Sequence, residues 1–517
     1  MCAATMRSSN RVLMPLHKDL YLRCRNKTLK RLLRRSYHAS IPLRNDLHYP
    51  SIAPKVSIDT KHIRENVSLY EQNCLDRNYV TQAEYPAKIC DLTKRWQSYQ
   101  QSSRLMRERS NSLTRQLASK SKPSDADGAD NEKMTREDIL KEARSLKEEL
   151  SVISQKQNSL NAEIGLLAKD IPNLMSDETP RGTVPTVVGF INEHPDPDPK
   201  IQTRSWRSHI DIGQELKLID FAAAATTSGW GWYYLLNEAA FLEQALVQFA
   251  LSIARKRGWS LISPPSMVYS HIADSCGFLP RDQNGEQQVY QIQQCSEDIG
   301  RKPQRSLAGT AEIPLASMKA NQTLEVENLP LKYIAVSRCY RAEAGARGAD
   351  TKGLYRVHEF TKVEMFAFTM PNSAASMLIF DEILSIQREI LTALQLHCRI
   401  LDMPSMDLGA SATRKRDIEV FFPSRRARAS GWGEVTSLSD CTDYQTRRLA
   451  TRLRSPQSNH VDQFLFPYTL NGTALAIPRV LAALLEYGWD EERGVVVIPE
   501  ALWPWMDGVR IIGKSKL

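Results

Sequence analysis

The sequence predicts an α+β protein in which a long antiparallel helical hairpin precedes one large domain of mixed helices and strands. Two heptad patterns lie between residues 85 and 171, and a stretch rich in prolines and acids follows them. From residue 204 to the end, helix-like and strand-like runs continue without a further break. The chain of 517 residues has 42% apolar and 25% charged residues, which is typical of a soluble globular protein with more than one domain.

The first 45 residues are distinguished by their charge. They contain eleven lysines and arginines, with leucines among them, and a single acid, Asp19. Because the net charge of the whole chain is +9, the remainder is close to neutral and overall charge does not argue for RNA binding. The composition is typical of a mitochondrial transit peptide and predicts location in the mitochondrial matrix. A disordered basic arm that touches nucleic acid is the alternative interpretation.

A helical hairpin is predicted within a domain spanning residues 55–175. Residues recur at spacings of four and three from Tyr85 to Leu117, and again from Ile139 to Ile171, as in coiled-coil seams. The polar, helix-breaking segment 122–131 predicts a short turn, so the two helices should be antiparallel. Arms of about thirty residues would extend about 50 Å at 1.5 Å per residue.

The charges of the two helices differ. Residues 88–120 contain eight basic and two acidic residues, whereas residues 134–169 contain six of each. A coiled coil with solvated charges accounts for this difference. For an isolated hairpin this is the favoured interpretation, but a basic stripe would also suit a phosphate backbone, and the hairpin alone does not decide.

Cysteine spacing and hydropathy argue against a zinc site and against a membrane-spanning segment. The nine cysteines contain no CxxC pair and form no cluster with histidines, so we expect no zinc site and a reducing compartment. No apolar run reaches eighteen residues, so we expect no membrane-spanning segment. The stretch 176–203 is expected to be a linker, and residues 204–517 are expected to form the second domain.

Three separated motifs carry residues suited to nucleotide chemistry. The first is Gly309–Leu315, the second pairs residues 338–345 with 356–366 around a glycine-containing turn, and the third is Tyr468–Arg479. On such a hairpin an arginine can neutralise a phosphate, an acid can accept from an adenine amine, and an aromatic ring can stack on the base. Each motif alone is weak evidence, because charged hairpins and strand–helix junctions are common.

In this order, the motifs resemble the signature of class II aminoacyl-tRNA synthetases, and within that class the seryl-tRNA synthetases. Thr310-Ala-Glu312 resembles the serine-binding loop of that family, and the segment from Glu434 to Arg448 resembles the stretch between its last two motifs. The segment Trp259–Val268 resembles its dimer-forming first motif, and the hairpin with Arg109-Ser-Asn111 resembles its tRNA-binding arm.

The resemblance implies a fold and an activity. The expected fold is an antiparallel sheet flanked by helices, assembled as a homodimer in which each arm serves the partner's active site. The expected reaction uses ATP and Mg²⁺ to convert L-serine to seryl-adenylate and then transfers serine to tRNA(Ser) in mitochondrial translation. A synthetase paralogue that binds RNA or protein without catalysis is the alternative, and a purely structural coiled-coil protein would explain residues 85–171 only.

The resemblance also assigns roles to individual residues. Arg341 bridges the α-phosphate and the serine carboxylate. Glu343 accepts from the adenine amine, Phe360 and Arg479 hold the ring, and Arg479 also reaches the γ-phosphate. Glu434 and Ser437 bind Mg²⁺. The remaining assignments are the serine pocket, formed with Arg341 by Thr310, Glu312, Glu364, Asn471 and Thr473, and the tRNA contacts Arg107 and Arg115 on the first helix of the hairpin.

Some positions depart from the family pattern. Leu438 and Asp440 replace small or amide residues, Arg416 replaces a tyrosine, and the segment 405–407 lacks the usual glycine. None of them is among the reacting residues, so these departures affect the expected pocket geometry more than the expected activity. The presence of Arg341, Glu434 and Arg479 favours the active enzyme over the non-catalytic paralogue.

Overall fold

The computed structural model describes residues 53–119, 135–193, 206–279, 287–343, 353–425, 431–454 and 464–513. The predicted transit peptide and the predicted turn at 122–131 lie outside the described residues. Among the described residues, no helix is both long and apolar enough to span a membrane.

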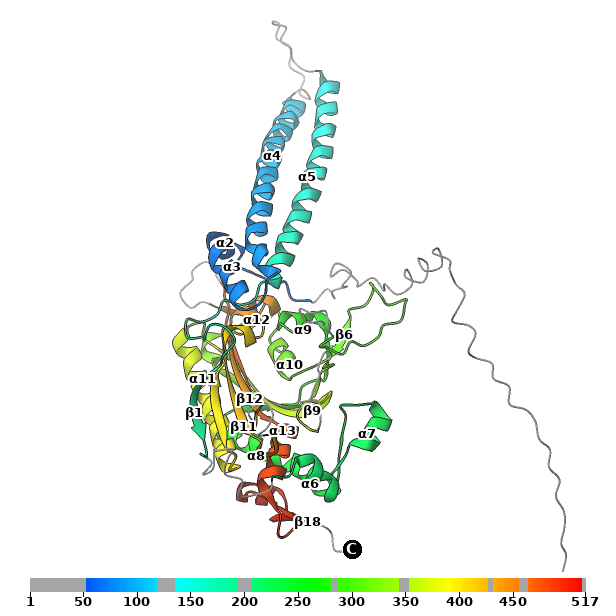
Figure 1. Ribbon diagram of the computed structural model, residues 1–517. Coiled ribbons are helices and arrows are strands. Elements are labelled where there is room, and N and C mark those ends of the chain that lie inside the picture. The colour runs from blue at the N-terminus through cyan, green and yellow to red at the C-terminus, as the bar shows by residue number, and fades with distance from the viewer. Residues whose placement is uncertain are drawn as a thin grey trace, which may run out of the picture. The chain divides into compact units, whose positions relative to one another are not determined.

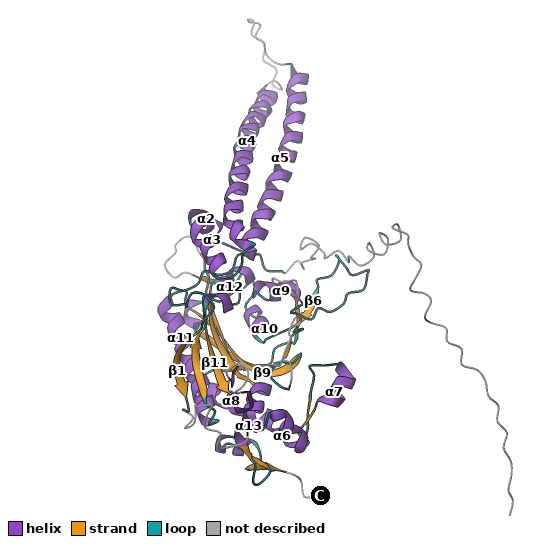
Figure 2. Cartoon of the chain, in the orientation of Figure 1, coloured by secondary structure: helices purple, strands orange, loops and turns teal. Residues whose placement is uncertain are grey.

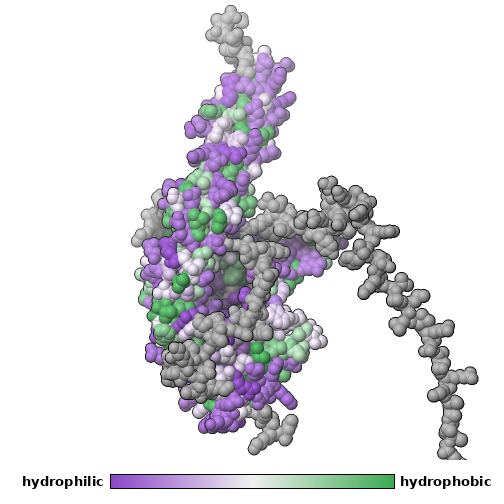
Figure 3. Space-filling model, in the orientation of Figure 1, coloured by the Kyte–Doolittle hydropathy of each residue, from purple (hydrophilic) through white to green (hydrophobic). Residues whose placement is uncertain are grey.

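The helical hairpin is present with nearly the predicted bounds (Figure 1). Its helices pack through a seam in which Ile89, Leu113 and Ile139 are fully or almost fully buried. An ion pair of 2.7 Å between Arg109 Nε and Glu142 Oε1 links the two helices. The space-filling view shows mainly hydrophilic residues on the visible face of the arm (Figure 3). The elements of this part are α2 (Thr60–Glu65), α3 (Val67–Asp76), η2 (Gln82–Glu84), α4 (Tyr85–Ser119) and α5 (Arg136–Asp170).

The second part is built on an eight-stranded sheet in the described chain, with strand order β1-β10-β11-β12-β15-β9-β8-β4. All neighbouring strands are antiparallel except β4 and β8. The strands are β1 (Thr186–Ile191), β4 (Ser260–Ile262), β8 (Leu331–Tyr340), β9 (Glu359–Thr369), β10 (Cys398–Asp402), β11 (Arg414–Phe421), β12 (Trp432–Thr442) and β15 (Tyr468–Ala476). This arrangement confirms the predicted antiparallel sheet flanked by helices (Figure 2).

Alternation along β9 separates the core from the functional face. Val363, Met365 and Ala367 belong to the main hydrophobic core, which also contains the buried sides of three long helices. The side chains of Phe360 and Glu364, at even-numbered positions of the same strand, are on the opposite face, because successive strand residues point to opposite sides. The three helices are α8 (Asn237–Lys256), α11 (Ser373–Ala393) and α13 (Ile477–Gly488).

Shorter elements surround this sheet. The helices are α6 (His209–Glu215), α7 (Phe221–Ser228), α9 (Ser270–Ser275), α10 (Glu312–Ser317), η3 (Val326–Asn328), η5 (Ser405–Asp407), η6 (Pro423–Arg425), α12 (Tyr444–Leu449) and η8 (Glu500–Trp505). The strands are β2 (Ile219–Asp220), β3 (Tyr234–Leu235), β5 (Met267–Tyr269), β6 (Arg305–Leu307), β7 (Thr323–Leu324), β13 (Arg452–Arg454), β14 (Phe464–Leu465), β16 (Trp489–Asp490), β17 (Val495–Val497) and β18 (Ile511–Gly513).

Part of the expected linker is instead a strand. Residues 186–191 form β1, which pairs antiparallel with β10 at the edge of the large sheet, with Ile191 opposite Cys398. The run Thr-Val-Val-Gly-Phe-Ile has the β-branched and aromatic residues that favour strands. The prolines and acids on both sides of this six-residue strand dominate the composition of residues 176–203, which is why the sequence predicted a linker there.

Two buried arginines connect the base of the arm to the sheet domain. Arg448 of α12 stacks 3.3 Å from the centroid of the Tyr444 ring and donates to the carbonyl of Lys169 at 3.0 Å, near the end of α5. Arg77, which is 1% exposed, donates to the carbonyls of Asn173 and Gly409. Guanidinium groups can satisfy the terminal carbonyls of a helix, so Arg448 also stabilises the end of α5.

Candidate active site

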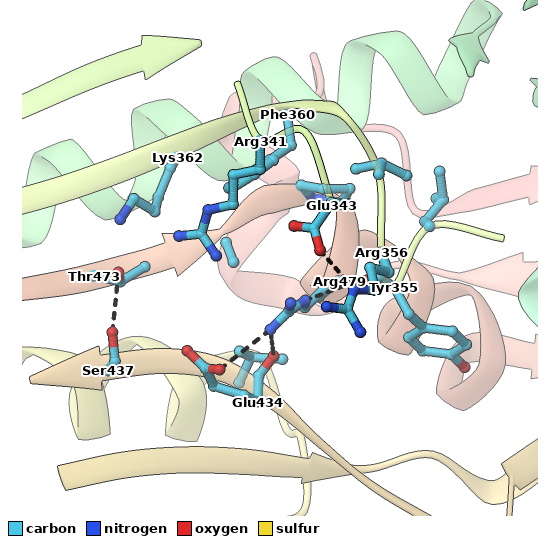
Figure 4. A pocket seen from close by; sticks show the side chains of 15 residues that line it. Arg341, Glu343, Tyr355, Arg356, Phe360, Lys362, Glu434, Ser437, Thr473 and Arg479 are labelled. Atoms are coloured by element: carbon cyan, nitrogen blue, oxygen red, sulfur yellow. Dashed lines mark hydrogen bonds and ion pairs between the residues drawn. The ribbon is translucent and has the colours of Figure 1, made fainter. Parts of the chain in front are cut away.

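A cleft lies beside the β8–β9 hairpin, on the face of the sheet opposite α8 and α11. It is lined by all of the residues expected to bind ATP and Mg²⁺, together with several that the sequence argument did not single out (Figure 4). Those predicted from the sequence are Arg341, Glu343, Phe360, Glu434, Ser437, Thr473 and Arg479. Four strands (β8, β9, β12 and β15) and the start of α13 bring these residues together, although the first and last of them, Arg341 and Arg479, are 138 positions apart in the sequence.

Arg341 follows the end of β8 and projects into this cleft (Figure 4). Its backbone N–H donates to the carbonyl of His358 at 2.9 Å, which continues the strand pairing beyond the regular ladder. Its guanidinium carbon lies 5.2 Å from the centroid of the Phe360 ring, within the range of a cation–π contact. Arg341 is therefore held at both its backbone and its side chain.

Glu343 forms an ion pair that the sequence argument did not anticipate. The guanidinium Nε of Arg356 lies 2.5 Å from Glu343 Oε2 (Figure 4). The backbone of Glu343 has φ +48°, in the left-handed region that residues with a Cβ seldom adopt. Such local backbone strain is concentrated at functional sites, where the surrounding structure maintains it.

An irregularity in β12 brings Glu434 and Ser437 to the same cleft. Residues three apart in a regular strand point to opposite faces. The pairing of β11 with β12 shifts register at Val435, since Ile418 lies opposite Thr436 whereas the next residue lies opposite Glu434. A bulge of this kind redirects side chains, so both oxygen-bearing residues can line the cleft.

Arg479 and Glu434 form the other charged contact of the cleft. Arg479 Nη1 lies 3.5 Å from Glu434 Oε2 and donates to the Glu434 carbonyl at 2.8 Å, while its Nε donates to the carbonyl of Tyr355 at 2.8 Å. Burial alone would raise the pKa of Glu434, but Lys415, Arg479 and Arg341 together lower it below its ordinary value. Glu434 is therefore ionised at neutral pH.

The five residues predicted for the serine pocket lie together beneath this cleft. Glu364 and Thr473 face each other across β9 and β15, and Thr473 Oγ1 donates to Glu364 Oε2 at 3.0 Å. Asn471 Nδ2 donates to Glu312 Oε2 at 3.1 Å, and the backbone N–H of Glu312 donates to Thr310 Oγ1 at 3.3 Å. All five side chains are buried, and Thr473 also lines the cleft, so the cleft and the pocket beneath it are continuous.

Glu312 has a strongly perturbed ionisation. Burial, followed by the nearby charge of Glu364, raises the pKa of Glu312 from 4.5 to about 8, although Lys362 and a hydrogen bond from Gln445 oppose that shift. Gln445 Nε2 donates to Glu312 Oε1 at 2.6 Å. A buried carboxyl group in this state changes its protonation near neutral pH, which is typical of functional sites.

Lys362 and Gln445 are site residues that sequence reasoning missed. Lys362 Nζ lies 2.7 Å from Glu364 Oε2, and both side chains are buried. A signal was available for Lys362, because it stands two residues before Glu364 and between it and Phe360 on the same strand face. No such local signal exists for Gln445, which reaches Glu312 over 133 positions of sequence.

The remaining predicted or unusual residues lie outside the cleft. Arg107 and Arg115 are exposed on α4 of the arm. Leu438 is fully buried in the core beneath the sheet, and Arg416 pairs with Asp402 at 2.7 Å. Asp440 accepts from Ser376 and from the backbone N–H of Thr442. The three departures therefore support the sheet and its packing rather than the cleft surface.

Comparison with known proteins accounts for this arrangement. Residues 58–175 match the family "Seryl-tRNA synthetase N-terminal domain", and residues 296–487 match the "tRNA synthetase class II core domain (G, H, P, S and T)". The mitochondrial serine–tRNA ligase of Saccharomyces cerevisiae is 42% identical over 71% of this chain and 78% of its own length. The chain belongs to the seryl-tRNA synthetases.

Other relatives extend the similarity over most of the molecule. The mitochondrial serine–tRNA ligase of Schizosaccharomyces pombe is 35% identical over 87% of this chain and 88% of its own length. A crystal structure of seryl-tRNA synthetase from Pyrococcus horikoshii complexed with ATP has a TM-score of 0.76 and 28% identity. That alignment covers 89% of this chain and 100% of the other, so it includes both the arm and the sheet domain.

Proposed function

We propose that the cleft and the pocket beneath it are where this enzyme converts serine and ATP to seryl-adenylate and pyrophosphate. The enzyme activates serine with ATP and charges tRNA(Ser), and its fungal relatives connect it with mitochondrial translation. The main support for this assignment is that the cleft and the pocket beneath it are continuous. Thr473 belongs to both, so the serine carboxylate and the α-phosphate can meet beside Arg341.

In the first step, a serine carboxylate oxygen attacks the α-phosphorus and pyrophosphate leaves. Arg341 contacts both reactants and stabilises the charge that builds on the phosphoryl oxygens, because a fixed guanidinium needs little reorganisation. Adenine lies between Phe360 and Arg479 and donates its amine to Glu343. In the second step, a hydroxyl of the terminal tRNA ribose attacks the acyl carbon, and AMP leaves.

Two ion pairs of the cleft involve residues that we propose bind ATP. Arg356 Nε pairs with Glu343, and Arg479 Nη1 faces Glu434. An adenine amine competes with Arg356 for the Glu343 carboxylate, and the γ-phosphate draws Arg479 from Glu434. In these ion pairs Arg356 and Arg479 neutralise the two carboxylates proposed to bind adenine and Mg²⁺.

We assign Mg²⁺ to Glu434 and Ser437. Both present oxygen donors, which Mg²⁺ prefers, and the lowered pKa keeps Glu434 ionised. Ser437 Oγ lies 3.5 Å from Thr473 Oγ1, at the boundary between the two clusters. Two protein ligands suit a Mg²⁺ ion that takes its other ligands from phosphate and water. When bound, this ion neutralises the departing pyrophosphate.

The pocket chemistry favours serine over smaller amino acids. Glu364 Oε1 is buried and has no hydrogen-bond partner within the described ranges. Such an acceptor is costly unless a ligand supplies a donor. Serine offers both its ammonium and its hydroxyl group to the pocket, whereas alanine and glycine leave polar groups unpaired. Threonine keeps the hydroxyl group, so the pocket must reject it through a clash with its additional methyl group.

We further propose a homodimer in the mitochondrial matrix. The segment Trp259–Val268 carries the dimer-forming resemblance, and in a dimer each arm serves the active site of the partner. Location in the matrix agrees with the basic first 45 residues and with the mitochondrial relatives. Sedimentation velocity tests the dimer, and imaging of a reporter fused to residues 1–45 tests the import signal.

The deciding experiment is amino-acid-dependent ATP–pyrophosphate exchange with protein that lacks about the first forty residues. We expect exchange with serine and none above background with threonine, alanine, glycine or proline. Exchange with a different amino acid would mean that the pocket is assigned wrongly. Absence of exchange from a folded dimer that still binds tRNA would favour a non-catalytic paralogue.

A further inference from the structure

A cluster of aromatic residues surrounds His358 at the start of β9. Trp232 stacks on the His358 ring at 5.9 Å and 25°, and Trp230 meets it edge-to-face at 6.3 Å and 82°. Tyr290 approaches from a third direction, with its hydroxyl 3.1 Å from His358 Nδ1. The two tryptophans come from the short segment that joins α7 to β3.

Gly231 allows this close approach. Its φ of +85° is in the left-handed region, and a Cβ built there would lie 2.5 Å from His358 Cδ2. The backbone N–H of His358 donates to the Gly231 carbonyl at 3.0 Å. The segment is therefore held against His358 by a backbone hydrogen bond and by two ring contacts.

The cluster lies at the rim of the active-site cleft. The His358 carbonyl accepts from the backbone N–H of Arg341, and His358 Nδ1 lies 3.1 Å from the Arg341 carbonyl. The neighbours Val357 and Phe360 line the cleft itself. A molecule that rests on this cluster is thus within a few residues of the group that binds the α-phosphate.

Trp230 is the member of the cluster that is available to a ligand. It is 57% exposed, whereas Trp232, Tyr290 and His358 are half-buried. A single exposed aromatic residue is ordinary on a protein surface. This one differs because it packs against His358, whose neighbours Val357 and Phe360 line a site that must receive a polynucleotide end.

We propose that Trp230 is a stacking platform for the unpaired nucleotides at the 3′ end of tRNA. The inference rests on the proposed function, because transfer of serine requires the terminal ribose to reach the adenylate beside Arg341. Unpaired bases stack on aromatic side chains without regard to sequence. Arg356, whose side chain is 43% exposed at the cleft, provides a positive charge for the adjoining phosphates.

The test compares Trp230→Ala, Trp230→Phe and the control Tyr234→Ala, which removes an aromatic side chain of similar exposure on β3. We expect Trp230→Ala to reduce kcat/KM for tRNA charging by about tenfold, the usual effect of one lost base stack. Serine-dependent pyrophosphate exchange should remain unchanged. Trp230→Phe should recover most of the charging rate, and Tyr234→Ala should resemble the unmodified enzyme.

A binding measurement separates stacking from other effects. The unmodified enzyme should bind intact tRNA more tightly than tRNA lacking its unpaired 3′ nucleotides, and Trp230→Ala should remove that difference. Equal binding of the two tRNAs by the unmodified enzyme would overturn the proposal. A shift of Trp230→Ala from dimer to monomer in sedimentation would also overturn it, because Trp230 would then be an interface residue. Loss of pyrophosphate exchange in the unmodified enzyme would instead contradict the proposed function.

Discussion

Gln445 donates a 2.6 Å hydrogen bond to Glu312, although the two residues are 133 positions apart. Both side chains are buried, and the opposite side of the Gln445 amide accepts from Thr469 Oγ1 at 2.8 Å. The amide therefore fixes the orientation of Glu312 from outside the pocket. Because hydrogen bonds to a charged group contribute more than neutral ones, this contact favours the ionised form of Glu312.

Replacement of Gln445 by leucine should weaken serine binding. Loss of the donor raises the pKa of Glu312 further and frees its carboxyl group to rotate. We expect the KM for serine in pyrophosphate exchange to increase about tenfold or more, with little change in the KM for ATP. Thr469→Val is the matched control, because it removes the bond on the other side of the same amide. An equal increase in both variants would assign the effect to general packing.

Serine binding should depend on pH through Glu312. The pKa of this carboxyl group is raised to about 8, so below that pH the free enzyme holds a proton that the serine ammonium must displace. The dissociation constant of serine should therefore fall as pH rises from 6 to 8, by up to about tenfold per pH unit. Calorimetric titration with serine in buffers of different ionisation enthalpy measures the released proton. Glu312→Gln should bind serine weakly and without this slope.

The same shift predicts a dependence of stability on pH. Between the ordinary carboxyl pKa of 4.5 and about 8, the folded state holds a proton on Glu312 that the unfolded state has lost. The contribution of Glu312 to the free energy of unfolding should therefore decrease as pH rises through this range, by at most about 1.4 kcal/mol per pH unit. Denaturant unfolding of the unmodified protein and of Glu312→Gln should diverge accordingly. Parallel curves would contradict the assignment of this proton to Glu312.

Lys362 should be essential to the pocket because it neutralises Glu364 in a buried environment. Removal of one partner from a buried ion pair leaves an uncompensated charge and typically costs about 3–5 kcal/mol. We expect Lys362→Met to lower the melting temperature and to reduce pyrophosphate exchange strongly. The double variant Lys362→Met with Glu364→Gln should recover stability but not activity. Recovery of neither would indicate that Lys362 acts on other groups.

Charge reversal at Arg107 and Arg115 should affect tRNA charging while sparing adenylate formation. Both residues are exposed on α4, away from the cleft lining, so their proposed contact with tRNA phosphates is electrostatic. The loss should diminish as salt rises, because screening weakens the contact in the unmodified enzyme too. Lys147→Glu makes the charge change of a single such reversal on α5 and is the control for each arginine reversed separately. Equal losses in exchange and charging would contradict a role in tRNA binding.

The pattern of residues along the chain determined the hairpin and much of the fold of the second domain. Heptad spacing depends only on local periodicity. The start of α4 at Tyr85 and the end of α5 at Asp170 could therefore be predicted to within about one residue. Ordered motifs also identified the arginines and carboxylates of the cleft, because each motif is a short segment of strand or strand–helix junction. The edge strand at 186–191 was missed, since a six-residue strand has too few positions for its pattern to outweigh the flanking composition.

Only the tertiary structure decided how these groups are paired. The ion pairs of Glu343 with Arg356 and of Glu364 with Lys362 depend on strand register and side-chain direction. The support of Glu312 by Gln445 depends on how α12 packs, and the raised pKa depends on the burial that results. Sequence spacing records which side chains are present, whereas hydrogen bonding, burial and charge act over distances of a few ångströms that folding alone establishes.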